Sequence, residues 1–302
     1  MKILNFGSLN LDYVYRVEHL VRPKETLNAL SQTVHPGGKG LNQSVALAKA
    51  GAKVFHAGCL GQGGGMLKDL LLKNGVNTDF LLPVPVLQGN AVIQVDENGE
   101  NCILLFGGSN RCVTKTQVEE TLSHFSPGDW LVLQNEINLL PLIIRTAAEK
   151  GLRIVLNPSP YDENLNGADL HAVNWLLVNE VEAAQLSGSS DPEEAFRILH
   201  EQYPALSLLV TLGESGSIAF SEGKIVRQEA FRVDAVDTTG AGDTYTGYFI
   251  AALAQGSPLQ ECMRRASLAA SISVTRPGAA VSIPEKSEVD AALESLCQKA
   301  PR

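Results

Sequence analysis

The sequence predicts an α/β protein with a mainly parallel central sheet, helices on both sheet faces, and a small separate β layer. Short apolar runs alternate with helical segments through the second half of the chain. This alternation is typical of a parallel sheet covered on both faces. Two earlier regions, near 13–34 and 89–107, have the turn residues of hairpins instead. The 302 residues suffice for one such domain with an insertion.

The first half of the chain supplies the irregular part of the pattern. A short buried strand is expected at 3–6, and short strands at 13–17 and 27–34 flank a turn that contains Pro23. The turn Asp96-Glu97-Asn98-Gly99 predicts a hairpin. Its strands lie at 91–95 and 102–106, and the other elements of this half are a helix at 42–50, a strand at 54–57 and a helix at 66–73.

The two hairpin regions predict a small β-sheet over a binding edge, which is typical of a lid. We place this lid at about 12–34 and 88–108, inserted in a single domain that spans 1–302. A structural flap and a dimer face are the alternative interpretations, and these roles can coexist.

From about residue 114, strands and helices alternate regularly. The expected strands are 130–133, 153–156, 175–178, 208–211 and 217–220, and the expected helices are 114–124, 139–150, 181–186, 193–201 and 244–254. A strand or an extended entry is expected at 231–236. Ligands of parallel sheets bind beyond the carboxyl ends of the strands. Residues that follow these ends are therefore expected to share one rim: Gly7, Asn10, Asn135, Glu136, Asn157, Asn179, Thr211 and Gly213.

Composition restricts the class of partner. A net charge of −9 argues against a nucleic-acid or anionic membrane surface, but not against a nucleotide ligand. Five cysteines without a C-x-x-C pair favour reduced thiols in a cytoplasmic protein. The six histidines form no zinc-binding cluster, and no apolar run approaches the length of a membrane span.

The string Asp237-Thr238-Thr239-Gly240-Ala241-Gly242-Asp243 stands immediately before a predicted helix. Small residues there let backbone N–H groups approach an anion, which the helix dipole also favours. Asp243 beside such a turn suits a base that deprotonates a nucleophile, which suggests phosphoryl transfer to a hydroxyl. Ordinary helix capping is the alternative interpretation.

A second glycine motif, Gly37-Gly38-Lys39-Gly40-Leu41-Asn42, also precedes a helix. It is not a Walker A loop, because no Ser or Thr follows the lysine. Protein-kinase strings are absent, and the missing G-x-G-x-x-G near the first strand disfavours a nicotinamide dehydrogenase. The run 61–65 is expected to be a loop.

Five motifs occur in a characteristic order: Asn10-Leu11-Asp12, the run 37–42, Asn179-Glu180-Val181-Glu182, Val210-Thr211-Leu212-Gly213, and the run 237–243. Together they resemble the ribokinase-like family of PfkB-type carbohydrate kinases over essentially the whole chain. The resemblance implies a ribokinase-like three-layer α/β/α fold with a β lid. Gly107-Gly108-Ser109-Asn110 favours the members that phosphorylate ribose.

The resemblance also implies roles at the reacting end. Asp243 is the implied base, and the N–H groups of Gly240, Ala241 and Gly242 stabilise the charge that develops on the phosphoryl group. The implied sugar-binding residues, joined by Asp243 itself, are Asn10, Asp12, Gly38, Lys39, Asn42 and Glu136.

ATP, Mg²⁺ and a monovalent cation are the implied cofactors. The implied nucleotide-binding residues are Asn179, Thr211, Gly213, Gly216 and Gly242. Mg²⁺ is expected at Asn179 and Glu182, partly through water, although a helix cap explains the same pair. The implied K⁺ site comprises Asp237, Thr239, Ser273, Arg276, Gly278 and Ser282, and Pro277 departs from many relatives there.

These inferences predict an ATP-dependent kinase that converts D-ribose to ribose 5-phosphate. Fructose, 2-keto-3-deoxygluconate or a nucleoside is the alternative acceptor, and a sugar sensor without turnover is the alternative class. The expected partners are a small sugar and ATP, with no nucleic acid or membrane. A homodimer that pairs two lids is expected, because such pairing would bury the exposed edges and apolar faces of the lid sheets.

Overall fold

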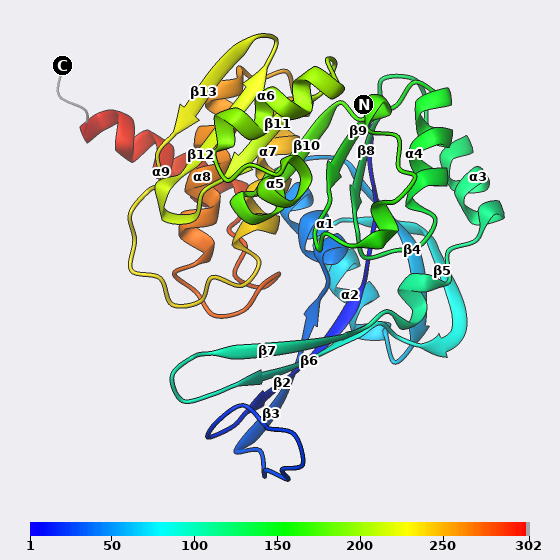
Figure 1. Ribbon diagram of the computed structural model, residues 1–302, viewed down its shortest axis with the longest axis vertical. Coiled ribbons are helices and arrows are strands. Elements are labelled where there is room, and N and C mark those ends of the chain that lie inside the picture. Colours follow the sequence, from blue (N-terminus) through cyan, green and yellow to red (C-terminus); the bar gives the residue numbers. More distant parts are fainter. Residues whose placement is uncertain (300–302) are drawn as a thin grey trace.

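The computed structural model describes residues 1–299, and within them a nine-stranded sheet forms the centre of the molecule (Figure 1). Its strand order is β13-β12-β11-β10-β9-β8-β1-β4-β5. Strands from β5 to β11 run parallel, whereas β12 and β13 are antiparallel to their neighbours. The strands are β1 (Ile3–Phe6), β4 (Val54–Gln62), β5 (Asn77–Leu87), β8 (Trp130–Gln134), β9 (Arg153–Asn157), β10 (Trp175–Asn179), β11 (Ser207–Thr211), β12 (Ser217–Ser221) and β13 (Lys224–Gln228).

Helices cover both faces of this sheet, so the predicted three-layer architecture is confirmed. The first face carries α1 (Lys39–Lys49), α2 (Gly65–Lys73), α7 (Ala241–Ala254), α8 (Leu259–Ser273) and α9 (Lys286–Lys299). The second face carries α3 (Lys115–Ser123), α4 (Leu140–Glu149), α5 (Glu180–Ser187) and α6 (Pro192–Gln202).

Successive strand residues alternate between the two faces, as the pleat requires. Ile3 and Val132 belong to the core of the first face, whereas Leu4 and Leu133 belong to the core of the second. In four adjacent strands, one position on the first face is polar instead of apolar. These positions hold Asn5, His56, Gln134 and Asn157, which lie beneath α1. The core thus gives way to polar side chains where the site lies.

A separate four-stranded sheet projects from the main body (Figure 1). Its order is β3-β2-β6-β7, with bounds β2 (Asn10–Arg16), β3 (Ser31–Gly37), β6 (Asn90–Val95) and β7 (Asn101–Phe106). Both expected hairpins are present, and a parallel pairing of β2 with β6 joins them. The strand expected at 27–34 starts only at Ser31, because its pairing with β2 ends there, opposite Arg16.

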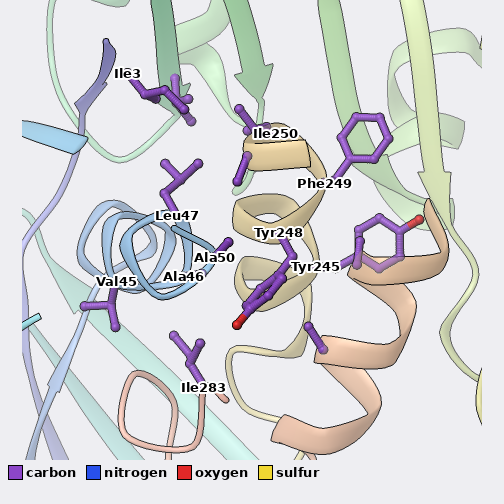
Figure 2. Packing of buried hydrophobic residues seen from close by; sticks show 14 of the residues in the cluster. Ile3, Val45, Ala46, Leu47, Ala50, Tyr245, Tyr248, Phe249, Ile250 and Ile283 are labelled. Atoms are coloured by element: carbon purple, nitrogen blue, oxygen red, sulfur yellow. The ribbon is translucent and has the colours of Figure 1, made fainter. Parts of the chain in front are cut away.

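Helices α1 and α7 pack closely on the first face, as Figure 2 shows. Val45 and Leu47 of α1 belong to one buried cluster with Tyr248 and Ile250 of α7. Phe249 adds an edge-on contact with Trp175 of the sheet, at 5.2 Å between ring centroids. This packing sets the amino-terminal ends of the two helices beside each other.

Some elements differ from the sequence-based expectation. Residues 231–236 form no strand, so that alternative was wrong; β13 already occupies the sheet edge. The segment instead meets the end of α8, where Val236 N donates to Val274 O at 2.7 Å. Strands β5 and β13 and helices α8 and α9 had not been anticipated.

Two further expectations concern the cysteines and the membrane. Cys59, Cys102, Cys112 and Cys262 are free thiols, and the side chain of Cys297 lies outside the described part of the chain. Among residues 1–299, no helix combines the length and the apolar character that crossing a membrane would require.

Candidate active site

Two adjoining cavities open at the carboxyl end of the sheet, between the amino-terminal ends of α1, α5 and α7. The smaller, about 150 Å³, is lined by Lys39, Glu182 and Asp243 among others. The larger, about 710 Å³, extends toward α8. Both are lined by Thr211, Thr238, Ala241 and Gly242. The two glycine motifs of the sequence therefore meet at one place, with Asp243 beside their junction.

Asp243 lies in the first turn of α7 and is only 7% exposed. Asn42 Nδ2 donates to its Oδ2 at 3.0 Å, and Gln43 Nε2 donates to its Oδ1 at 2.9 Å. Each carboxylate oxygen thus accepts one amide hydrogen and keeps a further lone pair for another donor. The carboxylate is buried, held in one orientation and directed into the smaller cavity.

The turn before Asp243 supplies backbone donors. Gly240 caps α7 with φ of 75°, a left-handed conformation that glycine adopts without strain. The first N–H groups of a helix have no carbonyl partner within it. Ala241 N donates to Thr238 O at 3.2 Å, so one of the three expected donors is engaged inside the turn. Gly242 lines both cavities and lies where an anion would be held.

Lys39 and Glu136 are both partly buried and meet beside the site through the Lys39 backbone. Lys39 N donates to Glu136 Oε2 at 3.0 Å, and Ser8 Oγ donates to the same oxygen. Burial raises the pKa of Glu136, against the opposing effect of the Lys39 ammonium. Burial disfavours the charged form of Lys39, but Asp243 and the other carboxylates outweigh it and raise the pKa of Lys39. Ser8 was not among the residues that the sequence analysis selected.

Asp12 extends the acidic cluster from strand β2. Burial, together with the charges of Glu136 and Asp243, raises the pKa of Asp12 to about 7. Gly38 brings the backbone close to this strand: its φ is 92°, and a Cβ there would lie 2.9 Å from Asn10 N. The carboxylates of Asp12, Glu136 and Asp243 interact electrostatically with one another, and this cluster offers many hydrogen-bond acceptors to a ligand that carries hydroxyl groups.

Asn10 and Asn42 are two further buried polar residues beside this cluster. Asn110 Nδ2 donates to Asn10 Oδ1 at 2.7 Å, and Leu9 N donates to Asn110 Oδ1 at 3.0 Å. Asn110 thereby fixes the Asn10 amide, a role that the sequence analysis missed although it singled out the run 107–110. Asn42 Oδ1 is buried without a partner. A buried unpaired acceptor is costly, which fits a site where a ligand hydroxyl donates.

The larger cavity contains three residues that the sequence analysis had selected for a nucleotide, Thr211, Gly213 and Gly216. Phe231 and Val233 give it apolar walls, and Ser267 and Ser271 of α8 add hydroxyl groups. Apolar walls with a few polar groups are typical of sites for planar small molecules.

Asn179 and Glu182 form a capping box at the start of α5. Glu182 N donates to Asn179 Oδ1 at 2.8 Å, and Asn179 N donates to Glu182 Oε2 at 3.1 Å. Both also line the smaller cavity. Within the described residues, no group of three or more His, Cys, Asp or Glu side chains is suited to enclose a metal ion. The pair therefore fits Mg²⁺ that arrives with phosphate and water ligands, because Mg²⁺ needs few protein carboxylates.

The residues selected for a monovalent cation lie together, but most of their side chains are engaged. Asp237 accepts from Thr239 N at 2.9 Å and from Gly278 N at 2.8 Å. The guanidinium of Arg276 pairs with Glu288. The hydroxyls of Ser273 and Ser282 donate to carbonyls three residues earlier. Backbone carbonyl oxygens and the remaining lone pairs of the Asp237 carboxylate are the ligands that this segment could offer to a cation.

The chain is similar to known carbohydrate kinases over most of its length. Residues 1–286 match the model of the pfkB family carbohydrate kinases. The ribokinase of Haemophilus influenzae is 34% identical over 292 residues, which cover 93% of this chain and 95% of the relative. Ribokinase from Cryptococcus neoformans in complex with ADP has a TM-score of 0.84 and 33% identity, and covers 96% of this chain and 99% of that one. Ribokinase from Arabidopsis thaliana, complexed with ribose and ATP, has a TM-score of 0.83 and 28% identity, with 97% and 98% covered.

Proposed function

Since this chain belongs to the pfkB family of carbohydrate kinases, we propose that it transfers the γ-phosphoryl group of ATP to the primary 5-hydroxyl of D-ribose. As a member of this family it is a phosphotransferase with an alcohol group as acceptor. One observation supports the proposal above all: the buried carboxylate of Asp243 lies where the two cavities adjoin.

The proposed sugar site adjoins the smaller cavity, and Lys39 and Asp243 belong to both. Asn10, Asp12 and Asn42 are the proposed partners of the sugar hydroxyls, with Gly38, Lys39 and Glu136 beside them. The unpaired Asn42 Oδ1 supports this role, since a sugar hydroxyl would satisfy it. Ribose is bound together with ATP in the Arabidopsis complex, and the relatives described above are named ribokinases.

In the proposed reaction, Asp243 takes the proton of the 5-hydroxyl as its oxygen attacks the γ-phosphorus. The new O–P bond forms as the bond between the γ-phosphorus and the β,γ-bridging oxygen breaks, and ADP leaves. The backbone N–H groups of Gly240 and Gly242 are the proposed donors to the charge that develops on the phosphoryl oxygens. Ala241 N donates to Thr238 O, so Ala241 contributes to the shape of the turn. Positioning supplies most of the rate in such transfers, so a rigidly held Asp243 is what the chemistry requires.

The larger cavity is the proposed ATP site, with Thr211, Gly213 and Gly216 along the nucleotide. Asn179 and Glu182 would hold Mg²⁺ partly through water, and that ion would neutralise phosphate charge. Backbone oxygens of the Asp237–Thr239 and Ser273–Ser282 segments would hold K⁺, which would order the anion-binding turn. We further propose a cytoplasmic location, where ATP is available and cysteines stay reduced.

The protein is also proposed to form a homodimer through the four-stranded sheet, which would serve as the lid of the sugar site. Strand β7 is an edge strand, and its residues are exposed along its whole length. An exposed apolar edge strand is a ready template for pairing with a second chain.

A coupled ADP-release assay with purified protein, Mg²⁺, K⁺ and a panel of acceptors tests the proposal. Ribose is expected to give the highest kcat/KM, above 2-deoxyribose, fructose, 2-keto-3-deoxygluconate and nucleosides. Asp243→Asn is expected to bind ribose but to lose phosphorylation by at least about 10³-fold. Near-normal turnover by Asp243→Asn would refute the mechanism, and ribose binding without turnover by the wild type would indicate a sugar sensor.

A further inference from the structure

A row of buried amide side chains lies behind Asp243, under helix α1. Asn5 of β1, Gln134 of β8 and Gln43 of α1 are each fully buried, and Asn157 of β9 ends the row. Asn5 is the one polar residue of β1, and Gln134 is the polar last residue of the otherwise apolar β8. Buried polar groups are usually hydrogen-bonded, and every amide nitrogen and oxygen of Asn5, Gln43 and Gln134 has a partner except Gln134 Oε1.

Every polar atom of the Gln43 amide is engaged. Its Nε2 donates to Asp243 Oδ1 at 2.9 Å and to Asn157 Oδ1 at 3.3 Å, while Gln134 Nε2 donates to its Oε1 at 2.7 Å. Rotating the amide by 180° would place Oε1 against two acceptor oxygens and would bring two NH₂ groups together. Only one of the two orientations satisfies these contacts, and in it Gln43 donates to Asp243.

The orientation of Gln134 is fixed from the opposite side. Its Nε2 also donates to Asn5 Oδ1 at 2.9 Å. Asn5 Nδ2 in turn donates to the backbone carbonyl of Gly40 and to Ser44 Oγ, both at 2.9 Å. A backbone carbonyl can only accept, so it determines which end of the Asn5 amide carries the hydrogens. The Gly40 carbonyl thus fixes the orientation of the Asn5 amide. The Asn5 amide fixes that of Gln134, and Gln134 fixes that of Gln43.

We propose that Gln43 is a positioning residue for Asp243, and that Gln134 acts on the reaction through Gln43. This inference rests on the proposed function, in which Asp243 takes the proton of the acceptor hydroxyl. Asn42 holds Oδ2 and Gln43 holds Oδ1, so the two donors together fix the plane of the carboxylate. Loss of the Gln43 donor would free the carboxylate to rotate away from the acceptor hydroxyl.

The test compares Gln43→Met, Gln134→Met and the double variant in steady-state kinetics with ribose and ATP. Gln43→Met is expected to lower kcat by about 10- to 100-fold, the usual effect of losing a hydrogen bond to a charged group. Its KM for ribose is expected to change by less than about threefold, because transition-state positioning is lost and not sugar binding. Gln134→Met is expected to lower kcat less, and the double variant to match Gln43→Met.

Gln117→Met is the matched control. Gln117 is another buried glutamine, 7% exposed, whose Nε2 donates to Gly58 O on the opposite face of the sheet. It is expected to lower the melting temperature without changing kcat. Should a methionine variant of the row melt below the assay temperature, Gln43→Asn withdraws the donor while keeping an amide, and is expected to give the same loss of kcat.

Two results would overturn the inference: a kcat of Gln43→Met equal to that of Gln117→Met, or fully additive losses for Gln43 and Gln134. Asp243→Asn is measured in parallel. Loss of its kinase activity shows that the proposed function stands even where the inference about Gln43 fails. If Asp243→Asn keeps its activity, the proposed function fails, and the inference fails with it for a reason that the assay identifies.

Discussion

Ala46 of α1 and Gly247 of α7 lie in direct contact, and a Cβ on Gly247 would come within 2.3 Å of the Ala46 Cβ. Asn42 and Asp243 lie one helical turn earlier in the same two helices, and their side chains hydrogen-bond at 3.0 Å. The closest approach of the helices therefore sets the distance between the proposed sugar-binding amide and the proposed base. Figure 2 shows this packing around Ala46.

Gly247→Ala is expected to force α1 and α7 apart, because the new methyl group meets Ala46 and the Leu47 backbone at less than 3.0 Å. Overpacking of this kind typically costs about 1–3 kcal/mol of unfolding free energy. We also expect kcat to fall, since Asn42 and Asp243 move with their helices. Chemical denaturation and kinetics measure the two effects, with Gly65→Ala as control, where a Cβ meets nothing within 4 Å. Equal behaviour of the two variants would contradict the prediction.

Asp12 gives a prediction for stability against pH. Its pKa is raised from 3.8 to about 7, chiefly by burial and then by Glu136 and Asp243. Between these two values the native state keeps a proton that the unfolded chain has released. The unfolding free energy contributed by this group therefore falls as the pH rises through that window.

Asp12→Asn removes the buried charge and is expected to be more stable than the wild type at pH 8. The difference should shrink toward pH 4.5, where native Asp12 is already protonated. The same variant is expected to raise the KM for ribose at pH 8, since a carboxylate acceptor is lost. Urea denaturation at the two pH values measures the first effect. A stability difference that does not depend on pH would show that the charge of Asp12 is not what matters.

Local sequence signals identified most of the candidate site. Gly38, Gly240 and Asp243 stand in short glycine motifs whose backbone requirements are readable from residue type alone. The parallel order of the central strands also followed from their alternation with helices. Residues 231–236 were ambiguous because their apolar-polar pattern suits a strand. In the structure this segment forms no strand and contributes to the wall of the larger cavity.

The amide row was not predictable from the sequence. Asn5 and Gln134 are single polar residues in short apolar strands, and local pattern does not show which residues such side chains contact. Their function depends on strand order: β8 lies beside β1, so that Gln134 reaches Asn5 across 129 positions of sequence. Asn110 was missed for a similar reason, since its partner Asn10 lies 100 positions away.

Glu182 has two roles that one substitution can separate. Glutamine at this position keeps the capping box, because its side-chain oxygen can still accept from Asn179 N. Glu182→Gln is therefore expected to retain the wild-type melting temperature but to need more Mg²⁺ for half-maximal activity. Asn179→Ala removes the cap and is expected to cost about 1 kcal/mol of unfolding free energy.

Mg²⁺ titrations of kinase activity and thermal melts measure the two roles of Glu182. An unchanged Mg²⁺ requirement in Glu182→Gln would leave Glu182 with the capping role alone. The charge of the side chain, and not its length, is what this comparison varies.

Strand β7 predicts the oligomeric state. Ile103, Leu104 and Phe106 are 56%, 71% and 51% exposed on a strand at the edge of its sheet. Apolar side chains on both faces of an unpaired edge favour burial against a second copy. Leu104→Lys places a charge at the most exposed of these positions and is expected to shift the protein from dimer to monomer.

Sedimentation velocity at several protein concentrations measures this shift. Leu72→Lys is the matched control, because Leu72 lies in α2 on the main body and is 51% exposed. It is expected to leave the dimer intact. A wild type that sediments as a monomer at micromolar concentration would contradict the proposed dimer, whereas a dimer that survives Leu104→Lys would place the interface elsewhere. Because β7 pairs with β6, and β6 with the strand that carries Asp12, loss of the dimer is also expected to raise the KM for ribose.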